Sequence, residues 1–206
     1  NFLIMNHPSD SSLSKGHMHE GEISTKLGLK GIPSIAEEIM VDRDLNLCKY
    51  TNSRLHLSYI STKESINKIK KAKSNGLKVS ADVPIHNLFL TEKSISNFDT
   101  RYKVSPPLRT KKDNLSLING LKNDTIDIIS CDHSPINEEY KKTEFDNAEN
   151  GIIGLESAFG LLGKHIIQKI GISKLIEKIS INPRKVLNIE EVKIEEENKA
   201  NLTLFN

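Results

Sequence analysis

The sequence predicts an α/β protein with a parallel sheet, built from four strand–helix units, which is half the number in an eight-stranded βα barrel. Two observations predict this class. Short apolar segments alternate with segments of helical periodicity along the chain. In addition, residues 125–131 (TIDIISC) are almost wholly apolar, as expected of a strand that is buried on both faces of a sheet. We expect residues 1–189 to form the half barrel and residues 190–206 to form a connector and strand toward a small β domain.

The first predicted unit begins with a short apolar strand at residues 2–5, followed by a long loop at residues 8–33, which are rich in Ser, Gly and His. A helix is predicted from Ser34 to about Lys49, because Ser34 and Glu37 have the spacing of a capping box. The residues available to its inner face are Ile35, Ile39, Leu45 and Cys48.

The second unit consists of a strand at residues 54–61 (RLHLSYIS) and a helix at residues 63–75. Gly76 is expected to end this helix. The apolar residues that recur at helical spacing are Ile66, Ile69 and Ala72.

The third and fourth units have strands at residues 77–83 and 125–131, and a helix at residues 113–122 lies between them. Before that helix, Pro106 and Pro107 exclude helical structure. Further segments are predicted as helices at 156–170, at 173–180 and from Asn182 onward, and as a strand at 200–205.

Composition excludes several classes of function. The 29 basic and 27 acidic residues are intermixed, so no basic patch for nucleic acid is expected. No apolar run approaches the ~20 residues that span a bilayer, and no secretion signal is expected. Cys48 and Cys131 lack metal-site or disulfide spacing, which fits a reducing cytoplasm. The chain also opens inside a predicted strand without an initiator Met, as expected of a piece of a longer protein.

Polar side chains lie within or directly after every predicted strand, and in a βα barrel the strands' C-terminal ends meet at one mouth. They are Asn6, His7 and Asp10 for the first strand, His56, Tyr59, Ser61 and Thr62 for the second, Asp82 and His86 for the third, and Asp132 and His133 for the fourth. Imidazole and carboxylate groups bind zinc, and a further carboxylate can act as a general base. Each histidine could instead cap a strand or bind a backbone carbonyl.

Asp132 is the foremost candidate for chemistry. It directly follows a strand that has no other charged group after Asp127. A carboxylate in that position needs a cation or hydrogen-bond donors to stay ionised. The alternative is an Asx turn that leads to Ser134 and Pro135.

The segment 102–135 (YKVSPPLRTKKDNLSLINGLKNDTIDIISCDHSP) resembles the dihydroorotase signature around the last barrel strand. Residues 27–33 (LGLKGIP), residues 56–64 (HLSYISTKE) and the segment NGIIGLE that begins at Asn150 resemble the same family. The resemblance covers nearly the whole chain. It implies the C-terminal half of a (β/α)8 TIM-type barrel, starting from the fifth strand.

Dihydroorotases interconvert carbamoyl-aspartate and the cyclic amide dihydroorotate in pyrimidine biosynthesis, with one or two zinc ions at the barrel mouth. The resemblance implies that His7 is a zinc ligand, with Asn6 as an alternative alignment by one position. It implies that Asp132 is both a metal ligand and the general base. Asn150 and Gly151 lie where backbone groups of the family meet the substrate ring.

The sequence also departs from the family pattern. Tyr59 stands where a second zinc-binding His is usual, and a phenol is a poor zinc ligand because its pKa is near 10. Ser105 stands where a substrate-binding Asn is usual, and Ile136 where a His often meets the substrate carboxylate. His86 and Asn87 replace a His-His pair. The His-x-His motif of strand one and the bridging residue of strand four would lie upstream of this chain.

Three functions therefore stay open. The first is zinc-dependent hydrolysis of a cyclic amide by the intact parent protein. The second is a non-catalytic dihydroorotase-like subunit that assembles with aspartate transcarbamoylase or forms a homo-oligomer, which Tyr59, Ser105 and Ile136 favour. The third is a hydantoinase, dihydropyrimidinase or allantoinase type of cyclic amidase. The 206 residues alone are expected to be inactive, because four units leave two sheet edges open.

Overall fold

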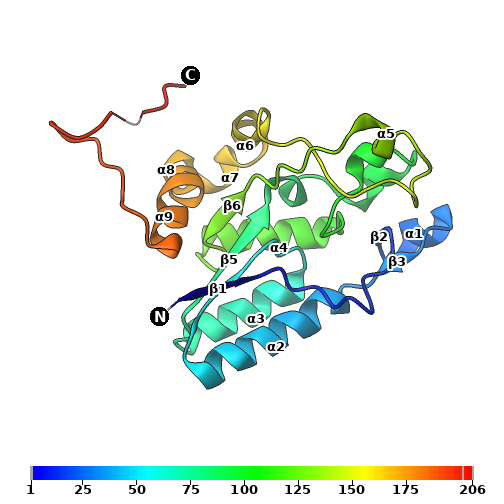
Figure 1. Ribbon diagram of the computed structural model, residues 1–206, viewed down its shortest axis with the longest axis horizontal. Coiled ribbons are helices and arrows are strands. Elements are labelled where there is room, and N and C mark those ends of the chain that lie inside the picture. Colours follow the sequence, from blue (N-terminus) through cyan, green and yellow to red (C-terminus); the bar gives the residue numbers. More distant parts are fainter. Residues whose placement is uncertain (1, 201, 206) are drawn as a thin grey trace.

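The computed structural model describes residues 2–200 and 202–205, and a four-stranded parallel sheet lies at its centre (Figure 1). The strands, in sheet order, are β1 (Leu3–Asn6), β4 (Arg54–Leu57), β5 (Val79–Pro84) and β6 (Ile128–Ser130). Parallel neighbours must be joined by crossovers over a face of the sheet. The predicted α/β class with a parallel sheet is therefore confirmed.

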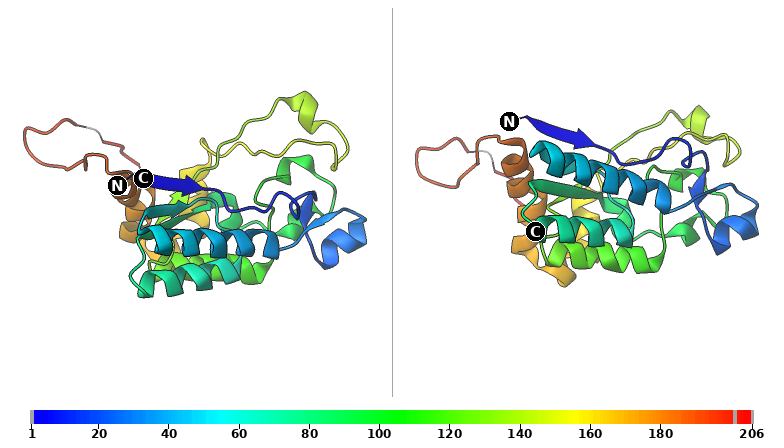
Figure 2. Two further views of the ribbon diagram at one scale, coloured as in Figure 1. Left: turned by 60° about the horizontal axis from the view of Figure 1, so that its bottom comes forward. Right: turned by 90° about the horizontal axis from the view of Figure 1, so that it is seen from below.

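Three helices cover one face of this sheet and lie side by side (Figure 2). They are α2 (Ile35–Thr51), α3 (Lys63–Ser74) and α4 (Lys111–Lys122). The main hydrophobic core lies between these helices and the strands, and its fully buried members include Leu57, Ile69, Val83, Leu117 and Leu121. The core fixes the strands, and the strands in turn fix the side chains at their C-terminal ends.

Helix α2 differs from its prediction in two respects. The side chain of Ser34 makes no capping hydrogen bond, so the predicted capping box is wrong. Ile35 and Ile39 are exposed, whereas Val41 and Leu45 are buried. The buried stripe follows the positions i, i+4, i+7, i+8 and i+11 from Glu37. The two isoleucines lie on the opposite side of the helix.

Helices α3 and α4 agree more closely with the sequence. The side chain of Thr62 accepts a hydrogen bond from the Ser65 amide at the start of α3, and Ile66, Ile69 and Ala72 are buried as predicted. Thr110 and Asp113 form a reciprocal capping box at the start of α4. The helix begins at Lys111, two residues before its predicted start.

The predicted loop at residues 8–33 contains regular structure. Two short parallel strands, β2 (Met18–His19) and β3 (Gly31–Ile32), flank helix α1 (Glu22–Leu27). Met18 packs with Ile95 and Phe145 in a separate small hydrophobic cluster. Elements of two and six residues are too short to give a recognisable hydrophobic period, which is why the sequence did not predict them.

Apart from α4 and β6, the chain beyond β5 forms short helices and no further strand among the described residues. Single 3-10 turns lie at η1 (Ile85–Leu88), η2 (Glu92–Ile95) and η3 (Thr100–Tyr102), and α5 (Glu138–Lys141) follows β6. The predicted helix at 156–170 is divided into α6 (Ala158–His165) and α7 (Ile167–Ile170). The predicted helix at 173–180 consists of α8 (Ile172–Ile176) and a π-helical segment, Glu177–Ile181, before α9 (Asn182–Leu187).

The predicted last strand is not observed in the part of residues 200–205 that the structure describes, and Asn201 and Asn206 lie outside it. The described part of residues 190–205 contains no helix or strand and extends away from the sheet (Figure 1). None of the described helices is long and apolar enough to cross a membrane.

Candidate functional site

Three of the predicted site residues closely follow the C-terminal ends of strands in the central sheet, and long loops extend from these ends (Figure 1). His7 follows β1, Tyr59 follows β4 by two residues, and Asp132 follows β6 by two residues. The His7 and Tyr59 rings make an edge-to-face contact with centroids 5.4 Å apart. The charge of Asp132 raises the pKa of Tyr59, after the larger effect of burial. The structure thus brings His7, Tyr59 and Asp132 to one region.

Asp82 connects three neighbouring strands beneath this region. Its Oδ2 lies 3.0 Å from His56 Nε2, and its Oδ1 accepts hydrogen bonds from the Tyr59 amide at 3.1 Å and from Ser130 Oγ at 2.6 Å. Tyr59 has a φ of 61°, a left-handed conformation that is uncommon for an aromatic residue. The bond from its amide to buried Asp82 helps to hold that conformation.

Asp132 has the environment of a proton acceptor. Its side chain is only 12% exposed, and its φ of 48° directs the backbone out of the strand. Burial and then the nearby charge of Asp82 raise the pKa of Asp132, and a hydrogen bond from Ser134 partly opposes this. A carboxylate whose pKa is raised toward neutrality is a better general base than an ordinary surface carboxylate.

Two histidines close to these acidic groups are held neutral by burial. Burial lowers the pKa of half-buried His7, although Glu37 and Asp82 oppose the change. Burial lowers the pKa of His86 to about 4, and its Nε2 lies 3.7 Å from Asp132 Oδ2. A neutral imidazole retains a lone pair, so His7 is suited to bind a metal or a substrate N–H group.

The described residues do not by themselves fit a metal ion. No group of three or more His, Cys, Asp and Glu side chains in the described part of the chain could hold one. Tyr59 lies beside His7, and its pKa is raised, so the phenol remains protonated and is a poor ligand. His7 and Asp132 could supply at most part of a coordination shell.

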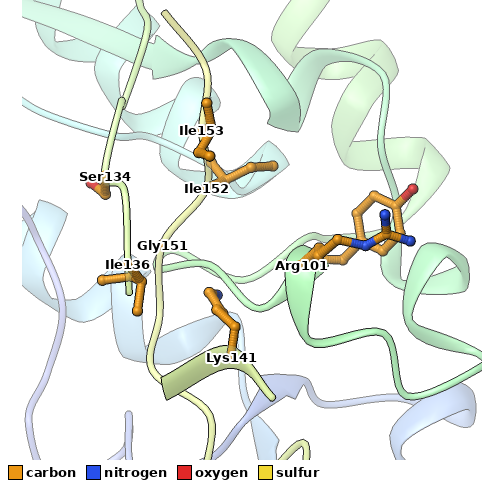
Figure 3. Close-up of a pocket in the computed structure, with 8 residues that line it drawn as sticks. Arg101, Ser134, Ile136, Lys141, Gly151, Ile152 and Ile153 are labelled. Atoms are coloured by element: carbon orange, nitrogen blue, oxygen red, sulfur yellow. The ribbon is translucent and has the colours of Figure 1, made fainter. Parts of the chain in front are cut away.

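The predicted substrate-binding residues are divided between two cavities. Ser105 and Asn150 line one cavity together with His7. Gly151 lines a neighbouring cavity of about 270 Å³ together with Ile136. Figure 3 shows Ile136 beside Gly151, with Lys141 extending toward them from α5. Asp132 is not among the residues that line either cavity.

Several strand-end residues are bound to other parts of the protein. Asn6 Nδ2 donates to Asp44 Oδ2 at 2.5 Å, and Asp10 Oδ1 accepts from the Ser12 and Leu13 amides. His133 Nδ1 accepts from the Gly154 and Leu155 amides, and buried His56 is bound to Ser80 and Asp82. These contacts favour structural roles for Asn6, Asp10, His56 and His133.

A buried ionic network borders the cavity at His7, and the sequence did not predict it. Arg109 is 2% exposed and donates to Ser61 Oγ at 3.1 Å, to His19 Nδ1 at 3.2 Å and to the Ile32 carbonyl at 3.0 Å. Glu37 Oε2 lies 4.0 Å from Arg109 Nη2, and the Glu37 carboxylate accepts hydrogen bonds from the Ser61 and Thr62 amides. The network ties α2, the β2–β3 region and the loop after β4 together, and its members are far apart in sequence.

Comparison with known proteins identifies relatives over almost the whole chain. A sequence profile of the family described as dihydro-orotase-like matches residues 1–65. A dihydroorotase from Thermoanaerobacter sp. (strain X514) is 47% identical over 190 residues, which are 91% of this chain and 44% of that protein. A dihydroorotase from Caldicellulosiruptor saccharolyticus is 43% identical over 204 residues, or 98% and 47% of the two chains.

Solved structures share the fold. An L-hydantoinase from Arthrobacter aurescens superimposes with a TM-score of 0.79 at 22% identity, over 90% of this chain and 43% of that one. A dihydroorotase from Saccharomyces cerevisiae superimposes with a TM-score of 0.72 at 15% identity, over 92% of this chain and 51% of that one. The chain spans about half the length of the curated relatives it matches. The chain belongs to the dihydroorotase-like family.

Proposed function

We propose that the whole protein hydrolyses, and in reverse forms, a cyclic amide, interconverting dihydroorotate and carbamoyl-aspartate in pyrimidine biosynthesis. The observation that carries this proposal is Asp132, a largely buried carboxylate at a strand end whose pKa is raised. The names of the relatives that are 47% and 43% identical support the substrate.

In this proposal Asp132 accepts the proton of the attacking water and passes it to the ring nitrogen as the amide bond breaks. A raised pKa favours the first transfer, because it makes the carboxylate a stronger proton acceptor. Ser105 and Asn150 would contact the substrate from the cavity that His7 also lines, and the Gly151 backbone would contact it from the neighbouring one.

Zinc, as one or two ions, belongs to the proposal for the whole protein. This chain would contribute His7 and Asp132, and the remaining ligands would have to come from outside it, because no described group of three donors could hold a metal. Metal analysis of the full-length protein tests this, and one or two zinc ions per chain are expected. A protein without bound zinc that still hydrolyses dihydroorotate would contradict it.

The direct test of the function is dihydroorotate hydrolysis by the full-length protein and by Asp132→Asn. Loss of a general base costs roughly 10²- to 10⁴-fold in rate. Asp42→Asn is a matched control, because Asp42 is an exposed carboxylate on α2 that pairs with Lys68. A wild-type protein without turnover, or an Asp132→Asn variant as active as the control, would contradict the proposed role.

A second candidate is a non-catalytic subunit that assembles with aspartate transcarbamoylase or with further copies of itself. Tyr59 is the observation that favours it, because a protonated phenol packs against His7 and lies near the charges of Asp132 and Asp82. Co-purification with aspartate transcarbamoylase, without turnover and without bound zinc, would support this candidate. Turnover of dihydroorotate by the purified protein would exclude it.

A cyclic amidase of the hydantoinase type is the third candidate. Its support is the fold shared with the L-hydantoinase at 22% identity, which is weaker than the support from the 47% identical dihydroorotase. Parallel assays with hydantoin and dihydrouracil distinguish these substrates from dihydroorotate. The first proposal requires that dihydroorotate has the highest kcat/KM.

A further inference from the structure

His86 is a buried polar side chain whose hydrogen-bonding groups are unused. It lies in η1, directly after β5, and is 2% exposed. Neither Nδ1 nor Nε2 has a hydrogen-bond partner among the described residues. A neutral imidazole carries one N–H donor and one acceptor, and leaving such groups unpaired in the interior is costly. The position therefore requires a partner that a small movement can bring within reach.

Asp132 is the charged group that faces His86. The distance from His86 Nε2 to Asp132 Oδ2 is 3.7 Å, which is too long for a hydrogen bond but within reach of a side-chain rotation. Hydrogen bonds in enzyme sites are often long in the absence of substrate and become shorter in the reacting complex.

Asp82, the other nearby carboxylate, is already engaged. Both of its oxygens are bound, one to His56 and the other to the Tyr59 amide and Ser130. Its charge acts on Asp132 as a like charge. Asp132 therefore has a like-charged neighbour in Asp82 and an unused hydrogen-bonding group in His86, and pairing with His86 would use that group.

We propose that His86 is a positioning residue for the reaction, whose Nε2–H group donates to Asp132 Oδ2 and so leaves Oδ1 directed at the attacking water. This inference rests on the proposed function of Asp132. The backbone of Asp132 is already fixed in a left-handed conformation, so the remaining freedom lies in its side-chain torsions. A hydrogen bond from His86 to Oδ2, in addition to the bond from Ser134, limits that freedom.

The kinetic test uses the full-length protein and the variants His86→Gln, His86→Asn and His86→Leu. The amide nitrogen of Gln can reach the position of Nε2, whereas that of Asn reaches only the position of Nδ1. A misplaced carboxylate should lower kcat for dihydroorotate by about 10- to 100-fold in His86→Asn and His86→Leu, with KM changed by less than about 3-fold. His86→Gln should keep clearly more of the wild-type kcat than His86→Asn.

The matched control is His165→Asn, because the His165 ring stacks on Phe89 next to η1 and does not contact the acidic residues. It should keep the wild-type kcat. Equal kcat values for the Gln and Asn variants would overturn the inference, as would a rise in KM in place of the fall in kcat. Variants that fail to fold are recognised by thermal unfolding, and the next measurement then decides.

Nuclear magnetic resonance of ¹⁵N-histidine-labelled full-length protein gives a readout that does not need turnover. His86, assigned by its absence in His86→Gln, should be the Nε2–H tautomer, and its Nε2 resonance should shift in Asp132→Asn. An Nδ1–H tautomer, or a resonance unaffected by Asp132→Asn, would overturn the inference. If the wild-type protein lacks turnover but shows this signature, the proposed function fails while the pairing of His86 with Asp132 stands.

Discussion

At the scale of single residues, Glu37 has the clearest structural role. It is 4% exposed and accepts hydrogen bonds from the amides and hydroxyls of Ser61 and Thr62, with Arg109 at 4.0 Å. Glu37→Ala leaves the buried guanidinium with less compensating charge, so we expect a loss of about 3–5 kcal/mol in the free energy of unfolding. Urea unfolding of the full-length protein measures it.

The neighbouring variant Glu38→Ala is the control for this prediction. Glu38 lies on the same helical turn but makes none of the Ser61 or Thr62 contacts, so its removal should cost less than about 1 kcal/mol. The loss of unfolding free energy for Glu37→Gln should lie between those for Glu37→Ala and Glu38→Ala, because the amide oxygen of Gln still accepts one set of hydrogen bonds. Equal losses for Glu37→Ala and Glu38→Ala would show that the network contributes little.

His19 gives the protein a defined sensitivity to acid. Burial and then the charge of Arg109 lower the pKa of His19 from 6.5 to about 4, while the charge of Asp113 opposes the change. Glu92 Oε2 lies 3.9 Å from His19 Nε2. Because the folded-state pKa is below the unfolded one, the stabilisation is complete above pH 6.5 and is lost as the pH falls toward 4. The free energy of unfolding should fall by at most about 3 kcal/mol over this interval.

The variant His19→Asn isolates this effect, because Asn Oδ1 can still accept from Arg109 but does not titrate. Unfolding free energies of both proteins are measured from pH 7 to pH 4. The wild type should lose more stability than the variant over this interval, and the difference should appear below pH 6.5. Parallel curves for the two proteins would show that His19 titrates normally.

Single residues also mark the limit of what the sequence could predict. The strand-end rule brought His7, Tyr59 and Asp132 to one region correctly, because it depends only on parallel strands sharing a direction. Glu37 was assigned to a capping box, because its spacing from Ser34 satisfies that pattern. Its actual partners lie 24 and 25 residues away, and no local pattern encodes such a distance.

At the scale of elements, long periodic segments were predicted well and short ones were not. Helix α3 agrees with its prediction to within one residue, because its apolar residues recur at helical spacing and Gly76 follows it. The β2–α1–β3 region was predicted as a loop, because its elements are stabilised by packing of Met18 against Ile95 and Phe145, which are distant in the chain. Tertiary contacts of this kind leave no local signal.

A buried lysine connects the π-helical segment to the residues just before β6. Lys178 is 1% exposed, and its Nζ donates to Asp124 Oδ1 at 2.8 Å and to the Ile126 carbonyl at 2.7 Å. Asp124→Asn removes the counter-charge and leaves a buried ammonium group, so we expect a loss of about 1–2 kcal/mol, reduced because Asp124 itself is exposed. Asn is chosen because it tolerates the left-handed φ of 60° at this position.

Lys178→Met should cost less than Asp124→Asn, because it removes the buried charge together with its need for a partner and keeps most of the apolar stem. Glu177→Gln, at an exposed neighbouring position, serves as the control and should change little. Thermal unfolding of the three full-length variants establishes the order. A larger loss for Lys178→Met would mean that its bond to the Ile126 carbonyl outweighs the ion pair.

At the scale of the whole molecule, the sheet edge at β1 is the most exposed apolar feature of the strands. β1 pairs with β4 along one side, and among the described residues no strand pairs with its other side. Ile4 and Met5 are 53% and 54% exposed. An unpaired edge that carries apolar side chains is a template for pairing with another chain. The chain matches about half the length of known dihydroorotases. In a complete barrel, a further strand would pair with this edge.

We therefore expect the 206-residue chain, expressed alone, to self-associate as its concentration rises, and the full-length protein to do so less. The double variant Ile4→Lys/Met5→Glu should reduce the association, because it places charges on the edge and removes apolar area worth roughly 25 cal/mol per Å² on burial. Leu47→Lys is the control, since Leu47 is equally exposed, at 53%, but lies on α2. Sedimentation velocity over a range of concentrations measures all four proteins. Association that Leu47→Lys reduces as strongly as the double variant would assign it to general surface hydrophobicity and not to the β1 edge.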